Sequence, residues 1–565
     1  MSVLREFLFN FASWLDAEPI RYALLAWTCL SLTVLTALAP VEPIGARKPG
    51  WAKSWLFALG VVLTLIAFRW PTWFVPEELN PDESQMLAGA LTLRHYPVFW
   101  KYVDGATGGP LNHFFLLFGS WFGLPLNYLG ARIIAALLEA GALLCLWAAL
   151  RRLTSERIAR VGILPGLAFW SFASWHDDIN YSSELVAVFL IAIAAWLLIT
   201  ALSQAELVTW RARLQAGLAG ICLGAVPFAK LQAVPVAGAV GLAGLLVLWH
   251  RRKQTGAGKI YGLLLGGASG ATIIVGAYLA VFGLFPQFWV SYILSNLGYV
   301  ANKPNSLTDM AVRFFALITV GHYFACFLLG SVVFALLHVL LVIEQVGPRL
   351  RAALLAAWLC TGAAYLAVIL PGREATHYLQ LMVIPVTFLA GIHLAALVQW
   401  KAAAGRSMAV SLVVFVLLTL GPQIWRRGTG WNIYLGNFAE YRARPPLSAS
   451  RFILARALPG DRLAMWGWNA QIYVETGLPQ GTREANTAYQ LIDMPLRSFY
   501  RDRYLRDIKR WRPAWFVDAV GPSAFGFKDR GINGFETFPE LAAFIGAQYT
   551  FVSEAGDLRI FHLKP

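Results

Sequence analysis

Residues 182–202 read SSELVAVFLIAIAAWLLITAL, and this stretch decides the class of fold. From Leu185 to Leu202 no residue carries a charge. Inside a bilayer a segment must satisfy its own backbone N–H and C=O groups, so about twenty apolar residues cross the hydrocarbon core as a helix. The stretch therefore predicts a membrane-spanning helix.

Runs of the same kind lie on both sides of this stretch. The chain of 565 residues is 58% hydrophobic and 14% charged, whereas soluble proteins carry about 25% charged residues. Together the runs predict a polytopic α-helical membrane protein with about twelve transmembrane helices. They are expected near residues 20–40, 54–75, 127–150, 159–176, 182–202, 214–230, 232–249, 260–284, 313–343, 352–370, 377–399 and 407–425.

The basic residues form short clusters in alternate loops between the apolar runs. The formal charge of +15 therefore indicates membrane topology, and no nucleic-acid partner is expected. Because cytoplasmic loops are enriched in Lys and Arg, these loops are predicted to face the cytoplasm, which leaves both termini and the long loops 76–126 and 285–312 outside. The residues concerned are Arg47, Lys48, Lys53, Arg151, Arg152, Arg157, Arg160, Arg211, Arg213, Arg251, Arg252, Lys253, Lys259, Arg349, Arg351, Lys401 and Arg406.

The composition changes after Arg426 to mixed polar segments with turn residues. We therefore expect two domains, a transmembrane domain over residues 1–425 and a soluble α/β domain over residues 426–565. In the second domain the pattern predicts strands at 462–466, 514–517 and 558–563, and helices at 447–457, 495–510 and 538–547. Within its basic run, SFYRDRYLRDIKRWRP at 498–513, the pattern fits a solvated amphipathic helix or a face that meets anionic headgroups.

The first outer loop, 76–126, contains two segments of interest. PLNHFFLLFGSWF at 110–122 is too short to cross a membrane but is suited to lie in its interface. NPDESQM at 80–86 places Asp82 and Glu83 side by side just after a predicted span. Two adjacent carboxylates can supply a general base, because a neighbouring charge and partial burial raise a carboxylate pKa. Asn80 as a helix cap, followed by first-turn acids, explains the same residues without catalysis.

Other ionisable residues gather at the predicted outer ends of spans. WHDDINYSSE at 175–184 ends in Glu184 at the start of a span, and PFAKLQ at 227–232 places Lys230 between two spans. PGREATHY at 371–378 adds Arg373, His377 and Tyr378. Cations from separate loops can converge on a phosphate, although a single histidine at a helix start is usually structural. No P-loop, GxGxxG, GxSxG or HExxH motif occurs.

In the order of these motifs the chain resembles the GT-C glycosyltransferases, specifically the family of protein mannosyltransferases and aminoarabinose transferases (glycosyltransferase family 39-like). The resemblance covers roughly residues 54–400. It rests on the acidic pair in PDESQM, the helix GGPLNHFFLLFGSWFG, Arg132 in LGARIIAALLEA, Glu184 in YSSELVAVFL, Lys230 in FAKLQAV and the turn GREATHYLQL. The chain departs from the aminoarabinose transferases where Gly108-Gly109-Pro110 replaces a Lys-Pro-Pro start.

The resemblance implies a GT-C fold and inverting transfer of a sugar from a polyprenyl-phosphate donor. Asp82 would be the general base, Glu83 its support and Glu184 a second carboxylate. The donor phosphate would be held by Lys230, Arg373, His377 and Tyr378. The resemblance also allows a divalent metal, Mg²⁺ or Mn²⁺, on Asp82 and Glu184.

The acceptor would be a hydroxyl of an envelope glycan, a lipid or a protein. The protein would lie in a bacterial inner membrane, with the active site and C-terminal domain facing the periplasm. The main alternative is a transporter or flippase of a lipid-linked sugar, which would also carry charges near the membrane. Against it, the chain shows no inverted repeat and no paired Gly/Pro-broken spans. A noncatalytic scaffold protein of the same fold is a third hypothesis.

Overall fold

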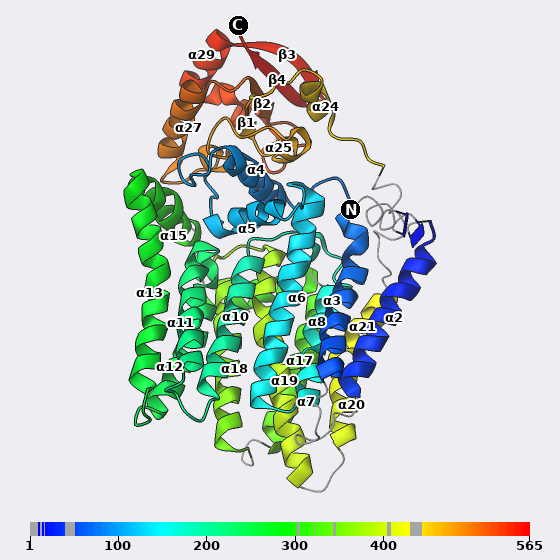
Figure 1. Cartoon of the computed structure of the whole chain (residues 1–565). Coiled ribbons are helices and arrows are strands. Elements are labelled where there is room, and N and C mark those ends of the chain that lie inside the picture. Colours follow the sequence, from blue (N-terminus) through cyan, green and yellow to red (C-terminus); the bar gives the residue numbers. More distant parts are fainter. Residues whose placement is uncertain are drawn as a thin grey trace.

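The structure is a computed structural model that describes residues 10–11, 14–15, 17–39, 51–301, 306–320, 322–342, 346–403, 408–429 and 443–565. The predicted basic residues Arg47, Lys48 and Arg406 lie outside the described residues. A bundle of long helices forms one part of the molecule, and an α/β domain sits at one end of it (Figure 1). Helices α4 (Pro81–His95) and α5 (Pro110–Trp121) lie between the two parts.

Within the described residues, nine helices are long and apolar enough to cross a membrane. The helix α19 is the most enclosed of them and occupies the centre of the bundle, whereas α13 is mostly exposed at its edge. The nine spans are formed by α2 (Pro19–Leu38), α3 (Trp51–Trp73), α6 (Tyr128–Leu153), α10 (Leu185–Leu202), α12 (Val234–His250), α13 (Ala257–Phe282), α18 (Pro348–Ile369), α19 (Gln380–Ala403), and α20 (Met408–Thr419) with α21 (Gly421–Thr429).

Three of the twelve predicted spans take a different form. Predicted span 313–343 corresponds to α16 (Leu307–Val320) and α17 (His322–Val342), whose axes differ by 117°, and this pair would make a tenth span. Predicted span 159–176 is divided into α7 (Glu156–Gly162) and α8 (Leu164–Phe172). Predicted span 214–230 is α11 (Trp210–Ala225), whose 16 residues extend only about 24 Å.

The described basic loops, such as those after α6 and between α12 and α13, lie at the end of the bundle away from the α/β domain. Figure 1 shows the end of α6 and the connection from α12 to α13 at this end. The loops contact one another there, because Arg349 donates hydrogen bonds to the carbonyl of Arg152 and to Ser203 Oγ. The charge pattern thus separates the two ends of the bundle as the sequence predicts.

The C-terminal domain is built around a four-stranded sheet with the order β1-β2-β4-β3. The strands β1 (Leu463–Gly467) and β2 (Trp515–Ala519) are parallel, and β4 (Leu558–Leu563) pairs antiparallel with both β2 and β3 (Tyr549–Ala555). β1, β2 and β4 coincide with the predicted strands, and β3 was not predicted. The helices are α24 (Ser448–Leu454), α25 (Gln471–Thr476), α26 (Ala488–Leu491), α27 (Arg497–Trp511), α28 (Arg530–Asn533) and α29 (Pro539–Gln548).

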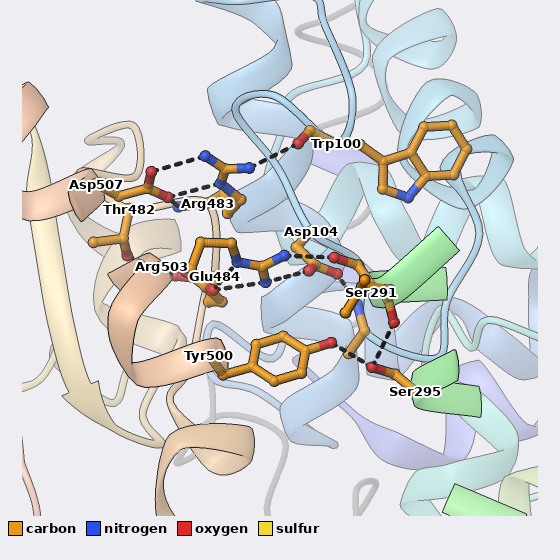
Figure 2. Close-up of polar contacts among 12 residues, drawn as sticks. Trp100, Asp104, Ser291, Ser295, Thr482, Arg483, Glu484, Tyr500, Arg503 and Asp507 are labelled. Atoms are coloured by element: carbon orange, nitrogen blue, oxygen red, sulfur yellow. Dashed lines mark hydrogen bonds and ion pairs between the residues drawn. The ribbon is translucent and has the colours of Figure 1, made fainter. Parts of the chain in front are cut away.

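A polar network joins this domain to the helix bundle (Figure 2). Arg503 on α27 is buried and binds Asp104 and Glu484, and it also donates to Ser291 beside α15 (Ser295–Ala301). The carboxylate of Asp507 holds Arg483 through bonds of 2.7 and 2.8 Å. Arg503 belongs to the basic run 498–513. This cation of the run therefore lies in the domain interface and faces neither solvent nor headgroups.

Candidate active site

Helix α4 places the two adjacent acids of the first outer loop. Asn80 is the N-cap, and its side-chain oxygen accepts from the backbone N–H of Asp82 at 2.8 Å. The capping interpretation therefore holds. The two acids nevertheless point to different surroundings, since the Asp82 side chain is 41% exposed and the Glu83 side chain is fully buried.

Glu83 forms a buried ion pair with Arg132 on α6. Arg132 Nε lies 3.1 Å from Oε1 and Nη2 lies 2.8 Å from Oε2, and the backbone N–H of Tyr181 also donates to Oε1 at 3.2 Å. Both carboxylate oxygens are thus bound by the protein. In this geometry Glu83 holds α4 against α6 and the loop before α10.

His377 lies between Asp82 and a third carboxylate, Asp177. Its Nε2 is 3.8 Å from Asp82 Oδ2, and its Nδ1 is 3.7 Å from Asp177 Oδ2. Asp177 also accepts from Asn80 Nδ2 at 2.6 Å and from the Thr376 hydroxyl. The acidic turn that the sequence singled out therefore anchors both the cap of α4 and the imidazole beside Asp82.

Lys230 and Glu184 form a second cluster. Lys230 directly precedes the second of two short 3₁₀ turns, η1 (Val226–Phe228) and η2 (Leu231–Ala233), and it takes an extended backbone there. Its Nζ lies 3.0 Å from Glu184 Oε1 and 2.6 Å from Ser183 Oγ, and 5.6 Å from the ring centre of Tyr378. In this structure the anionic partner of Lys230 is therefore Glu184.

The short segment η5 (Thr376–Leu379) connects the two clusters. Its consecutive residues His377 and Tyr378 are both buried, the first beside Asp82 and the second beside Lys230. Arg373 lies on the turn just before η5 and is half-buried. The residues predicted from separate loops therefore gather at the end of the bundle that faces the C-terminal domain. Glu83 lies at this end too, but its carboxylate is enclosed by Arg132.

Lys230 and Tyr378 also line a groove of about 400 Å³. Most of the remaining lining is apolar, and several of the side chains face outward from the bundle. The groove is bounded by Thr107, Leu231, Gln232, Val234, Pro235, Ile293, Asn296, Leu297, Ala367, Leu370 and Pro371. It thus combines a mainly apolar wall with the ammonium group of Lys230.

Gly109, the second glycine of the pair before α5, has a steric reason. The N–H of Gly109 donates to the carbonyl of Ala229 at 2.9 Å, and Asn112 Nδ2 donates to the same carbonyl at 2.8 Å. A Cβ atom on Gly109 would lie 2.1 Å from the carbonyl oxygen of Phe228. Gly109 thus brings α5 directly against the Lys230 loop, where a larger residue would not fit.

The described residues offer no clear ligand set for a divalent metal. In the part of the chain that the structure describes, no group of three or more His, Cys, Asp or Glu side chains is placed to hold a metal ion. One oxygen of Glu184 is already bound by Lys230. A metal on Asp82 and Glu184 therefore stays a prediction.

The carboxyl of Asp178, next to Asp177, should make the stability of the protein depend on pH. Burial, helped by the charge of Asp177, raises the pKa of the Asp178 carboxyl from 3.8 to about 8. Between these values the folded protein holds a proton that the unfolded chain has lost, so this group lowers stability as pH rises from about 4 to 8. We expect Asp178→Asn to raise the thermal unfolding temperature in detergent at pH 8 and to change it little at pH 4.5.

Asp177→Asn is the matched control, and its expected effect on the unfolding temperature at pH 8 has the opposite sign. Burial alone would raise the pKa of Asp177, but His377 and the Thr376 hydroxyl outweigh it and hold the pKa below its usual range. Its stabilisation is present above pH 4 and lost as pH falls. Asp177→Asn should therefore lower the unfolding temperature at pH 8. Equal shifts for both variants at pH 8 would contradict these assignments.

The fold is that of the GT-C membrane glycosyltransferases. It matches the crystal structure of ArnT from Cupriavidus metallidurans bound to undecaprenyl phosphate with a TM-score of 0.55 and 14% sequence identity, over 90% of this chain and 98% of that one. The apo structure of the same ArnT gives a TM-score of 0.51 and 13% identity over the same shares. No protein-family model matches the chain, and neither does any curated protein sequence. The expected fold is thus confirmed from structure, at a sequence identity that establishes fold alone.

Proposed function

We propose that this protein transfers a sugar from a polyprenyl-phosphate donor to an acceptor hydroxyl, on the membrane face that the C-terminal domain covers. The observation that carries the proposal is η5, which places His377 beside the half-exposed Asp82 and Tyr378 beside Lys230, and both Tyr378 and Lys230 line a mainly apolar groove. A lipid phosphate has the matching chemistry, an apolar tail with an anionic head. The ArnT structure of the same fold was solved with undecaprenyl phosphate bound.

In the proposed reaction Asp82 acts as general base. Its carboxylate takes the proton of the acceptor hydroxyl as that oxygen attacks the anomeric carbon of the donor sugar. The bond from the anomeric carbon to the phosphate oxygen breaks, and its electron pair leaves on the polyprenyl phosphate. Attack opposite the leaving group inverts the anomeric centre, so one base suffices and no covalent sugar–enzyme intermediate forms.

Lys230, assisted by Arg373, supplies the charge that stabilises the leaving phosphate. His377 lies between two carboxylates, where it can hold a proton beside Asp82. Glu184 pairs with Lys230 until the phosphate takes its place, and Glu83 fixes α4 and thereby Asp82. The proposed setting is a bacterial inner membrane, with this face toward the periplasm and an envelope glycan, lipid or protein as acceptor.

Binding of undecaprenyl phosphate tests the donor site without knowledge of the sugar. Lys230→Met alone would leave Glu184 as an uncompensated buried charge, so the double variant Lys230→Met with Glu184→Gln is the informative one. We expect it to fold and to bind undecaprenyl phosphate at least tenfold more weakly in native mass spectrometry, since hydrogen bonds to charged groups contribute about 1.5–3 kcal/mol.

Two controls separate the phosphate from the tail. Glu184→Gln alone keeps the ammonium and removes its competitor, so it should bind undecaprenyl phosphate as tightly as wild type or more tightly. Undecaprenol, which has the tail without the phosphate, should bind all variants equally. Wild-type affinity of the double variant for undecaprenyl phosphate would show that Lys230 does not hold the phosphate.

A further inference from the structure

The C-terminal domain lies directly on the helix that carries Asp82. Helix α25 packs against α4, and the buried Ala88 on α4 belongs to the hydrophobic core of the C-terminal domain. The backbone N–H of Gln480 donates to Thr92 Oγ1, also on α4, at 2.9 Å. α4 is therefore held by two domains at once.

One loop of the C-terminal domain, residues 480–487, makes most of the polar contacts to the first outer loop. Besides Gln480, the carbonyl of Arg483 accepts from the backbone N–H of Asp104 at 2.7 Å. Glu484 shares Arg503 with Asp104, as Figure 2 shows. The loop is thus fixed just before Asn486, which projects toward α4.

A chain of two hydrogen bonds runs from this loop to Asp82. Asn486 Nδ2 donates to Gln85 Oε1 at 2.7 Å, and Gln85 Nε2 donates to Asp82 Oδ1 at 3.0 Å. Gln85 follows Asp82 by three residues, so both side chains lie on one face of α4. Asn486 Oδ1 accepts from the backbone N–H of Ala488 at 2.9 Å, which leaves the amide nitrogen of Asn486 to face Gln85.

We infer that Asn486 of the C-terminal domain is a positioning residue for Asp82, acting through the orientation of the Gln85 amide. With Asn486 donating to its oxygen, Gln85 presents its NH₂ group to the Asp82 carboxylate and to the carbonyl of Pro81, which lies 3.3 Å away. If the amide turned over, its carbonyl oxygen would face Asp82 and repel it. The C-terminal domain in this way completes the catalytic group of the other domain. The inference rests on the proposed function, in which Asp82 is the general base.

The isosteric variant Asn486→Asp tests this role. A carboxylate at position 486 can only accept at neutral pH, so the Gln85 amide would turn its NH₂ group toward that carboxylate and away from Asp82. We expect kcat for release of undecaprenyl phosphate from the donor that wild type consumes to fall about tenfold. KM for the donor should stay unchanged, and the acidic limb of the pH–rate profile should move to higher pH.

Two further variants separate positioning from simple domain docking. In a Gln85→Ala background, Asn486→Asp should have no additional effect, because the connecting side chain is gone. Tyr500→Phe removes another interdomain hydrogen bond, the one to Ser295, and should leave kcat and the pH profile as in wild type.

A failure of this inference can be distinguished from a failure of the proposed function. If Asp82→Asn abolishes transfer while Asn486→Asp matches wild type in rate and pH profile, the inference is overturned and the base assignment stands. An equal loss of kcat in Asn486→Asp and Tyr500→Phe, with an unchanged pH profile, would also overturn it in favour of docking alone. If Asp82→Asn itself transfers sugar normally, the base assignment fails and takes this inference with it.

Discussion

Asp82→Asn is expected to lower the rate of sugar transfer by about 10²–10⁴, the range that general-base catalysis contributes. Asparagine has the shape of aspartate and keeps the oxygen that accepts from Gln85, so α4 and its cap should remain folded. It cannot take the acceptor proton. The measurement is the initial rate at which undecaprenyl phosphate is released from whichever undecaprenyl-phosphate sugar the purified wild type consumes.

The loss should appear in kcat, with binding of undecaprenyl phosphate unchanged, because Lys230 and the groove are untouched. Glu77→Gln is the matched control. Glu77 is a nearby half-buried acid whose carboxylate binds Arg444, outside the proposed site, and its variant should transfer at the wild-type rate. A wild-type rate in Asp82→Asn would show that another group is the base. A loss of donor binding in place of turnover would make Asp82 a binding residue.

The membrane spans could be predicted from the sequence because their signal is local. A run such as Leu185–Leu202 must be helical in lipid whatever surrounds it. The same logic does not show a short interruption inside an apolar run. The predicted span 159–176 is divided at Ile163 into α7 and α8, although the apolar pattern continues across that residue.

The residues of the candidate site could be identified from the sequence, but the sequence does not show which of them contact one another. Asp82 and Glu83 are adjacent and chemically alike, and only their positions on α4 leave one exposed and the other buried against Arg132. The 15 residues of α4 carry no clear apolar stripe, because one face packs on the C-terminal domain and another on the bundle. The contact of Asn486 with Gln85 spans 401 positions along the chain and leaves no local pattern.

Arg132→Met is expected to have the largest effect on stability. Arg132 is fully buried, and besides Glu83 it donates to the backbone carbonyls of Thr72, Val75 and Glu77 at 2.7–2.9 Å. Removing one partner of a buried ion pair costs about 3–5 kcal/mol, because the other charge is left without compensation. We expect the variant to lose its cooperative thermal unfolding transition in detergent, or to fail to accumulate as a monodisperse protein.

The variants Glu83→Gln and Arg132→Lys show which part of this arrangement matters. Glu83→Gln keeps the guanidinium and its three carbonyl partners, so it should destabilise the protein less than Arg132→Met. Arg132→Lys keeps the charge but has no planar fork, and one ammonium cannot reach both carboxylate oxygens and three carbonyls. It should therefore behave like Arg132→Met. If Arg132→Lys were as stable as wild type, charge alone would account for the pairing. The position of α4, and of Asp82 on it, would then not depend on the guanidinium geometry.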